Sequence, residues 1–342
     1  MTSRRRGSTR SMPSTTPSTR SLRGLPTGSS TEGPRTTARL VSQESPTANP
    51  ELDDGRRGAR ESAIVRTPEN LHIASLPAGE IRYLRAGAGT PIVLLHTLRT
   101  QLEYFGPLLG QLDTGRFEIV AIDLPGHGES SAPRAHYTAN YFTDAVEQVL
   151  DHCELRDAIV VGESIGACIA LALAARGNSR VRSVIALNPY DYGRRGGIRR
   201  SSALANVVFT AILFPVVGPV VANVGNKQVL RRIMAGGVYD RRALPDGLID
   251  DLHRCGSLPG HARAFRSLMR NWRSWIDART NYGHIEVPVT LSYGACDWSR
   301  PAERDADASA IPGARTGTLP DAGHFSSLDR PREIAKLIGE AA

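Results

Sequence analysis

A serine between two glycines is the residue of this sequence whose surroundings most strongly suggest chemistry. Ser164 lies at the centre of the segment GESIG (162–166), which follows the apolar run 157–161 and precedes a second apolar run, 168–175. The first run is typical of a buried strand and the second of a helix. A serine on the sharp turn between them would present its hydroxyl for nucleophilic attack. The alternative is a small residue that only fits a strand-to-helix turn.

The two glycines have a steric explanation. Where a strand turns sharply into a helix, side chains two residues before and after the turn would collide, and Gly162 and Gly166 have none. The same turn would direct the Ile165 amide at the oxyanion formed during attack. Glycine makes up 33 of the 342 residues, so G-x-S-x-G arises often by chance. Ser164 therefore needs partners elsewhere in the chain.

A serine hydroxyl needs a base, and that base needs an acid to orient it. Of the nine histidines, His324 lies in a loop between the last predicted strand and the last predicted helix. Asp297 follows the predicted strand 287–293. Both side chains would then lie at the edge where the strands end, which is where α/β sheets place their ligands. Asp191, which follows the predicted strand 181–187, is the alternative acid.

These residues are carried by a chain that alternates apolar runs with helical segments. A hairpin is predicted over 71–85, and strands are predicted at 91–95, 117–122, 157–162, 181–187, 287–293 and 315–319. Helices are predicted at 101–112, 141–152, 168–175 and 331–338. Short buried runs that alternate with helices indicate an α/β fold, in which helices cover both faces of a mostly parallel sheet.

The composition divides the chain into three parts. Residues 1–60 contain 20 Ser or Thr and no aromatic residue, and we predict a disordered tail there. Residues 61–189 and 286–342 would form the α/β core, and 190–285 a helical cap inserted into it. The tail has 11 Arg against 5 acidic residues, which is +6 of the net charge of +8. Because the tail lacks aromatic residues to stack on bases, we expect no specific nucleic-acid partner.

An apolar stretch within the predicted cap, residues 203–224, is long enough to suggest a membrane span. Pro215, Gly218 and Pro219 would interrupt such a helix, and Asn206 and Asn223 are unfavourable in lipid. Two short cap helices fit this pattern better, and contact of the cap with a membrane surface is the alternative. An apolar cap above a serine nucleophile predicts a small apolar substrate.

The sequence gives no sign of a metal ion or an organic cofactor. The four cysteines form no C-x-x-C pair and have no metal-ligand spacing. The sequence contains no apolar segment of the secretory-signal type, so we expect reduced thiols and a cytoplasmic location. The basic residues are 40 Arg and 2 Lys, a bias that suggests a GC-rich, bacterial genome.

Five segments together resemble the α/β-hydrolase family. They are LLHTLRT (94–100), AIDLPGHGESS (121–131), VVGESIGACIA (160–170), VTLSYGACDWSRP (289–301) and LPDAGHFSSLDRP (319–331). The resemblance covers about residues 71–339. It implies an eight-stranded, mostly parallel sheet with a helical cap inserted between strands six and seven.

The resemblance also assigns roles to individual residues. Ser164 matches the nucleophile, Asp297 the acid after strand seven, and His324 the base. Ile165 matches one donor of the oxyanion hole. The second donor belongs to the loop that begins at His96, where the amide of either Leu98 or Thr97 would serve.

This loop departs from the family pattern, because Thr97 stands where many members have glycine. Threonine reaches a positive φ less easily than glycine does, so the loop is expected to differ. For His96, we weigh bracing of the loop against contact with the substrate, and we favour bracing.

Arg99 follows in the same loop, and it has two possible roles. It could hold an acidic group of the substrate, since a guanidinium grips a carboxylate with two parallel hydrogen bonds. It could instead pair with a nearby acid, Glu103 or Asp123, and brace the loop. The second role is favoured because loop arginines usually pair locally.

The pattern as a whole predicts a serine hydrolase. The Ser-His-Asp triad would cleave an ester or related acyl bond through an acyl-enzyme, without a metal or cofactor. Serine rather than aspartate at the turn argues against dehalogenase and epoxide hydrolase chemistry. The alternatives are hydrolysis of a C–C or amide bond, acyl transfer to an alcohol, and a non-catalytic ligand-binding role.

Overall fold

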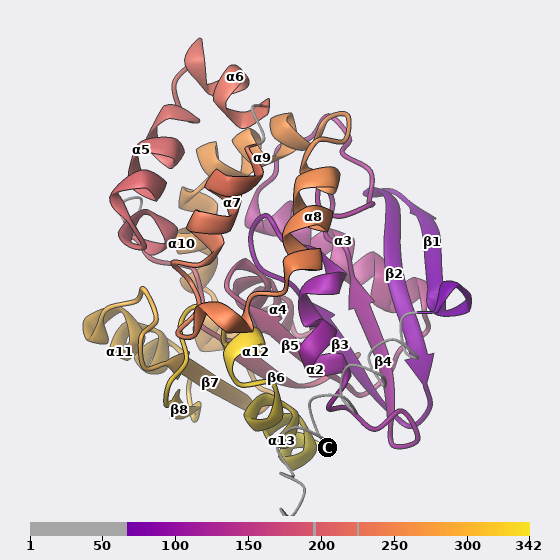
Figure 1. Cartoon of the computed structure of the whole chain (residues 1–342). Helices are drawn as coiled ribbons and strands as arrows, with labels where there is room; N and C mark the ends of the chain where they lie inside the picture. The colour runs from indigo at the N-terminus through magenta and orange to yellow at the C-terminus, as the bar shows by residue number, and fades with distance from the viewer. Residues whose placement is uncertain (1–66, 194–195, 224–225) are drawn as a thin grey trace, which may run out of the picture. The chain divides into compact units, whose positions relative to one another are not determined.

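An eight-stranded sheet organises the chain, as Figure 1 shows. The structure is a computed structural model that describes residues 67–193, 196–223 and 226–342. The predicted disordered tail, residues 1–60, lies outside the described residues. The strands are β1 (Leu71–Leu76), β2 (Gly79–Gly87), β3 (Thr90–Leu95), β4 (Phe117–Ile122), β5 (Ala158–Glu163), β6 (Val181–Leu187), β7 (Val289–Gly294) and β8 (Arg315–Leu319).

The strand order is β1-β2-β4-β3-β5-β6-β7-β8. Strand β2 pairs antiparallel with β1 and with β4, and the six strands from β3 to β8 are parallel to one another. The mostly parallel eight-stranded sheet predicted from the sequence is therefore confirmed. Because β3 to β8 are parallel, the residues that follow them emerge at one edge of the sheet.

Apolar residues cover both faces of the central strands. In β3, Ile92 and Leu94 belong to one hydrophobic cluster, and Val93 and Leu95 to the other. The first cluster contains residues of α2 (Gly106–Leu109), α12 (Ser326–Asp329) and α13 (Pro331–Ala341). The second contains residues of α3 (Ala139–His152) and α4 (Ile165–Ala175). A strand that is buried on both faces in this way reads as a continuous apolar run.

The helix predicted over 101–112 is shorter than expected and begins as a 3-10 helix. A 3-10 helix spans Leu102–Phe105, and only one α-helical turn, α2, follows it. Pro107 lies in the first turn of α2 and has no N–H to continue a helix that began earlier. The Leu102 amide instead donates to the Asp123 carboxylate at 2.8 Å.

Between β6 and β7 the described residues form helices and no strand. The helices are α5 (Ala203–Ala211), α6 (Val217–Asn223), α7 (Lys227–Met234), α8 (Asp246–Gly256), α9 (His261–Arg270) and α10 (Arg273–Arg279), with 3-10 turns at Gly197–Arg200, Arg241–Ala243 and Tyr282–His284. Helix α11 (Pro301–Ala310) lies between β7 and β8. The division into core and cap at residues 190 and 285 stays a prediction.

The apolar stretch 203–224 is broken in the structure. Helix α5 ends at Ala211, and α6 begins at Val217, beyond Pro215. Within the described part of the chain, no helix is long and apolar enough to cross a membrane. Several apolar side chains of this stretch are exposed: Val207, Phe214, Val216, Val217 and Val220.

Candidate active site

Ser164 lies on the turn between β5 and α4, in a strained conformation. Its φ is 61° and its ψ is −117°, values that residues with a side chain adopt only when the surrounding structure imposes them. The Ser164 amide donates to the Leu187 carbonyl of β6 at 2.9 Å. A strained residue at the end of a strand is a common feature of functional sites.

The glycines on either side of Ser164 are sterically required. A Cβ atom added at Gly162 would lie 2.1 Å from the Gly166 carbonyl oxygen. One added at Gly166 would lie 2.1 Å from the carbonyl oxygen of Leu95, at the end of β3. Gly162 therefore allows the strand and the helix to meet, and Gly166 allows the helix to approach the neighbouring strand.

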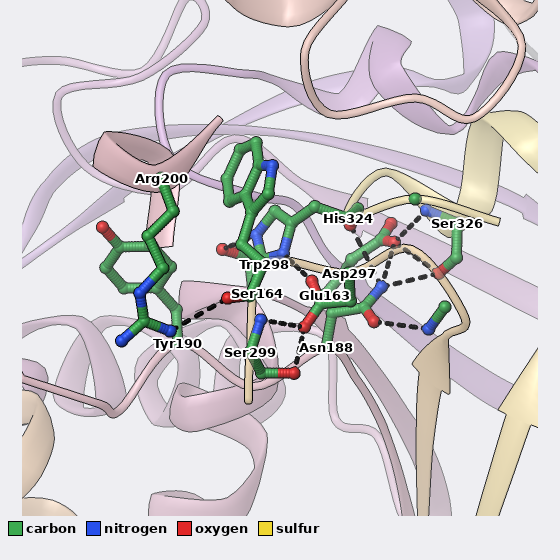
Figure 2. Close-up of polar contacts among 12 residues, drawn as sticks. Glu163, Ser164, Asn188, Tyr190, Arg200, Asp297, Trp298, Ser299, His324 and Ser326 are labelled. Atoms are coloured by element: carbon green, nitrogen blue, oxygen red, sulfur yellow. Dashed lines mark hydrogen bonds and ion pairs between the residues drawn. The ribbon is translucent and has the colours of Figure 1, made fainter. Parts of the chain in front are cut away.

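Ser164, His324 and Asp297 form one hydrogen-bonded series, drawn in Figure 2. His324 Nε2 lies 2.9 Å from Ser164 Oγ, and His324 Nδ1 lies 2.5 Å from Asp297 Oδ1. With Asp297 as acceptor, His324 carries its proton on Nδ1, and Nε2 is free to accept the proton of the serine hydroxyl. The His324 and Asp297 side chains are at most 1% exposed.

The second oxygen of Asp297 is also occupied. Asp297 Oδ2 accepts hydrogen bonds from the Ser299 amide, at 2.8 Å, and from the Ser299 hydroxyl. Burial alone would raise the pKa of Asp297, but His324 and the Ser299 donors outweigh it and hold the pKa below its usual value. The carboxyl group is therefore ionised at neutral pH and can orient the imidazole.

Asp191, the alternative acid, lies elsewhere. It is fully buried, and its carboxyl group makes no hydrogen bond with His324. Burial, together with the nearby Asp307 carboxylate, raises the pKa of Asp191 well above its usual value. A carboxyl group that does not contact the histidine cannot act as the orienting acid in this arrangement.

The loop that carries His324 is held by Glu163 and Asn188, two residues that the sequence analysis missed. Glu163 Oε1 accepts from the Ser326 amide and hydroxyl, both at 2.6 Å. Asn188 Nδ2 donates to the His324 carbonyl at 3.1 Å, and Asn188 Oδ1 accepts from the Gly294 amide at 2.8 Å. A buried carboxylate directly before the serine, in an otherwise apolar run, was the signal available in the sequence.

Both ring nitrogens of His96 contact the loop backbone. Nδ1–H donates to the Thr97 carbonyl at 2.8 Å, and Nε2 accepts from the Leu124 amide at 3.0 Å. Burial lowers the pKa of His96 to about 4, so the ring is neutral at neutral pH. These contacts are those of a bracing residue, and contact of His96 with a substrate stays a prediction.

Thr97 stands where a glycine was expected, and the next residues of the loop accommodate it. The positive φ falls at Arg99, at 62°, and Thr97 does not share it. The Thr97 carbonyl accepts from the Thr100 hydroxyl at 3.0 Å, which closes the turn. In the part of the chain that the structure describes, the Leu98 and Ile165 amides donate to no other protein group, so both remain available as donors.

Two cavities border the residues that carry the candidate oxyanion-hole amides. The larger one contains about 760 Å³ of empty space, part of it open to solvent, and is lined by Leu98, Arg99 and mostly apolar residues of α5 to α9. The smaller one, about 480 Å³, is lined by Ile165 and by residues that include Tyr190, Trp272 and Trp275. Leu98 and Ile165, which carry the two available amides, thus line one cavity each.

Arg99 lacks the partners that the sequence suggested for it. Glu103 and Asp123 pair instead with Arg82 of β2, at 2.8 Å and 2.6 Å. The predicted local pairing of Arg99 is therefore wrong, because an arginine distant in sequence already pairs with both acids. Across residues 67–193, 196–223 and 226–342, we find no cluster of three or more His, Cys, Asp or Glu side chains arranged to hold a metal ion.

The chain is similar in sequence to known proteins. The model of the alpha/beta hydrolase family matches residues 92–337. An uncharacterized protein of Mycobacterium tuberculosis is 24% identical over 285 residues, which cover 79% of this chain and 80% of that protein. The 2-hydroxymuconate semialdehyde hydrolase of a Pseudomonas species is 25% identical over 268 residues, which cover 75% and 87%.

Among solved structures, the enol-lactonase of Burkholderia xenovorans is similar in fold. It superposes with a TM-score of 0.63 at 24% sequence identity, covering 79% of this chain and 99% of the lactonase.

Proposed function

Since the chain belongs to the alpha/beta hydrolase family, we propose that it is a serine hydrolase that cleaves an ester or related acyl bond of a small apolar substrate. The observation that carries the proposal is the continuous contact from Asp297 through His324 to Ser164 at a strained strand-to-helix turn. This is the arrangement in which a serine hydroxyl becomes a nucleophile.

The first half of the reaction forms an acyl-enzyme. His324 Nε2 removes the proton of the Ser164 hydroxyl while Oγ attacks the substrate carbonyl carbon. The resulting oxyanion accepts hydrogen bonds from the Ile165 and Leu98 amides, which have no other partner among the described residues. The tetrahedral intermediate then collapses. His324 returns the proton to the leaving alcohol, and the acyl group stays on Ser164.

The second half releases the acid. His324 removes a proton from a water molecule, which attacks the acyl carbonyl, and the same amides hold the second oxyanion. His324 then returns the proton to Ser164 Oγ as the C–O bond breaks. Throughout, the Asp297 carboxylate stabilises the imidazolium and keeps the ring in its orientation.

The cavities support the proposed substrate class. A carbonyl group at Ser164 would have one cavity on the side of Leu98 and the other on the side of Ile165, and apolar side chains dominate the lining of the larger cavity. Apolar walls favour apolar acyl and alcohol groups. Hydrolysis of a C–C or amide bond, and acyl transfer to an alcohol, would use the same nucleophile and remain alternatives.

The test is turnover of p-nitrophenyl esters of graded chain length, with matched p-nitroanilides and with added alcohols as competing acceptors. We expect a burst of p-nitrophenol equal to the enzyme concentration, then slower steady-state turnover of the esters. Faster cleavage of the anilides, or transfer of the acyl group to the alcohol instead of water, would replace ester hydrolysis with one of the alternatives. Folded protein that turns over none of these compounds would contradict the proposal.

A further inference from the structure

The guanidinium of Arg99 is held in a fixed position at the wall of the larger cavity. Its Cζ atom lies 4.7 Å from the centroid of the Phe265 ring of α9. The guanidinium also lies against Gly256, where an added Cβ atom would be 3.1 Å from Arg99 Nη2. The positive φ of Arg99 turns the chain directly after Leu98. The charge is therefore next to a residue that carries one of the available amides.

Within residues 67–193, 196–223 and 226–342, no acidic group faces the charge of Arg99. Among the described residues, Arg99 forms no ion pair, and neither the larger cavity nor an adjoining hollow of about 220 Å³ is lined by Asp or Glu. Besides Arg99, the titratable groups on these walls are three histidines and a cysteine: His253 in the larger cavity, and His127, His261 and Cys255 in the hollow. Glu103 and Asp123, the acids nearest in sequence, are paired with Arg82.

An unpaired arginine in such surroundings lowers the stability of the unliganded protein. Burial lowers the pKa of Arg99 to about 10, so the group is still charged at neutral pH although part of its hydration is lost. Desolvated charges in proteins are normally paired, and an unpaired one is a strong site for a ligand of opposite charge.

We propose that Arg99 binds a carboxylate of the substrate, so that the preferred substrates are esters whose apolar part ends in an acidic group. This inference rests on the proposed function, and it narrows the substrate class from apolar esters to amphiphilic, singly charged ones. The planar guanidinium would accept the carboxylate as a bidentate pair, while the apolar side chains of α5 to α7 contact the methylene groups.

The first experiment compares two esters that differ only in this charge. Mono-p-nitrophenyl adipate carries a free carboxylate, and its methyl ester is the neutral analogue. We expect wild-type protein to show a kcat/KM at least tenfold higher for the acid, and Arg99→Met to reduce this ratio at least tenfold, mainly through KM. Arg99→Lys should reduce it less. The exposed cap variant Arg263→Met, which alters a charge outside the cavities, should leave the ratio unchanged.

A second experiment does not depend on turnover. Binding of hexanoate and of 1-hexanol to the Ser164→Ala protein is measured by calorimetry, with and without Arg99→Met. We expect hexanoate to bind more tightly, and Arg99→Met to remove the difference. Arg99→Met should also raise the melting temperature of the free protein or leave it unchanged, because it removes an unpaired charge.

The outcomes distinguish failure of the carboxylate site at Arg99 from failure of the proposed serine hydrolase function. If both esters are hydrolysed with equal kcat/KM, and hexanoate binds no better than hexanol, the carboxylate site is refuted and the serine hydrolase stands. If neither ester is hydrolysed but hexanoate binds through Arg99, the anion site stands and the proposed function fails. A lower melting temperature for Arg99→Met, with equal loss of kcat on both esters, would show a loop-bracing arginine instead.

Discussion

The indole of Trp298 lies flat against the imidazole of His324, with ring centroids 4.0 Å apart and planes inclined by 15° (Figure 2). The Trp298 Nε1–H group donates to the Gly236 carbonyl, in the segment between α7 and α8, at 3.0 Å, which fixes the indole. When His324 takes the serine proton it becomes a cation, and an indole face attracts a cation. Under the proposed function, Trp298 is therefore a positioning residue for His324.

Replacement of Trp298 should lower the rate of the chemical steps. A cation–π contact contributes about 1 kcal/mol, so Trp298→Leu should lower kcat roughly fivefold with little change in KM. Trp298→Phe keeps an aromatic face and should recover most of the loss. Steady-state kinetics on one ester tests this expectation. Equal losses for Leu and Phe would show that stacking on an aromatic face is not the reason for the effect.

The choice between the two acids predicts opposite results for two similar variants. Asp297→Asn should lower kcat by about 10⁴, because an amide in place of the carboxylate favours the wrong tautomer of His324. Asp191→Asn should keep most of the activity, because Asp191 makes no hydrogen bond with His324. Melting curves verify that both variants fold. If Asp191→Asn loses activity and Asp297→Asn keeps it, Asp191 is the acid that orients His324.

Glu163 should affect activity without touching the substrate. Its carboxylate holds the Ser326 amide and hydroxyl, two residues after His324. Removal of these bonds in Glu163→Ala should displace the His324 loop and lower kcat by roughly 10². Glu163→Gln keeps an acceptor oxygen and should lose less. If the two variants lose the same activity, the carboxylate charge, rather than the hydrogen bonds, is what matters.

The titration of His96 should lower the stability of the folded protein in mildly acidic solution. The folded protein lowers the pKa of His96 to about 4 from its usual 6.5, so the unfolded chain binds the proton more readily. The contribution of His96 to the stability of the folded protein is present above pH 6.5 and is lost as the pH falls toward 4. Its size is about 3 kcal/mol in the free energy of unfolding.

The measurement for His96 is urea unfolding at pH 7, 5.5 and 4, on wild-type protein and on His96→Gln, which cannot titrate. We expect His96→Gln to be less stable at pH 7 but to lose less stability between pH 7 and pH 4. The pKa of His127 is also lowered by burial, so some pH dependence should remain in the variant. Parallel pH curves for the two proteins would rule out His96 as a contributor.

The sequence was informative where the signal is local. Buried strands are largely apolar runs, so β4 and β6 were predicted to the residue, and the serine turn was identified from its glycines. The sequence could not decide between Asp297 and Asp191, because each follows a parallel strand at the same edge of the sheet. That choice depends on which loop reaches His324, and only the packing of loops determines it.

The residues that the sequence analysis missed or misjudged depend on contacts distant in the chain. Arg99 was expected to pair with Glu103, four residues on, but Arg82 reaches that acid from β2. Glu163 contacts a loop 163 residues away in sequence. Spacing along the chain carries no information about such partners, whereas it does carry information about helices and strands.

The most direct test of the central claim is the mass of the protein after reaction with a fluorophosphonate, followed by peptide mapping. We predict one adduct per chain, located on Ser164, formed rapidly by wild-type protein and about 10³-fold or more slowly by His324→Ala. The Ser164→Ala protein should fold normally and remain unlabelled. An unlabelled, folded wild-type protein, or equal labelling of Ser164→Ala, would contradict the assignment of Ser164 as the nucleophile.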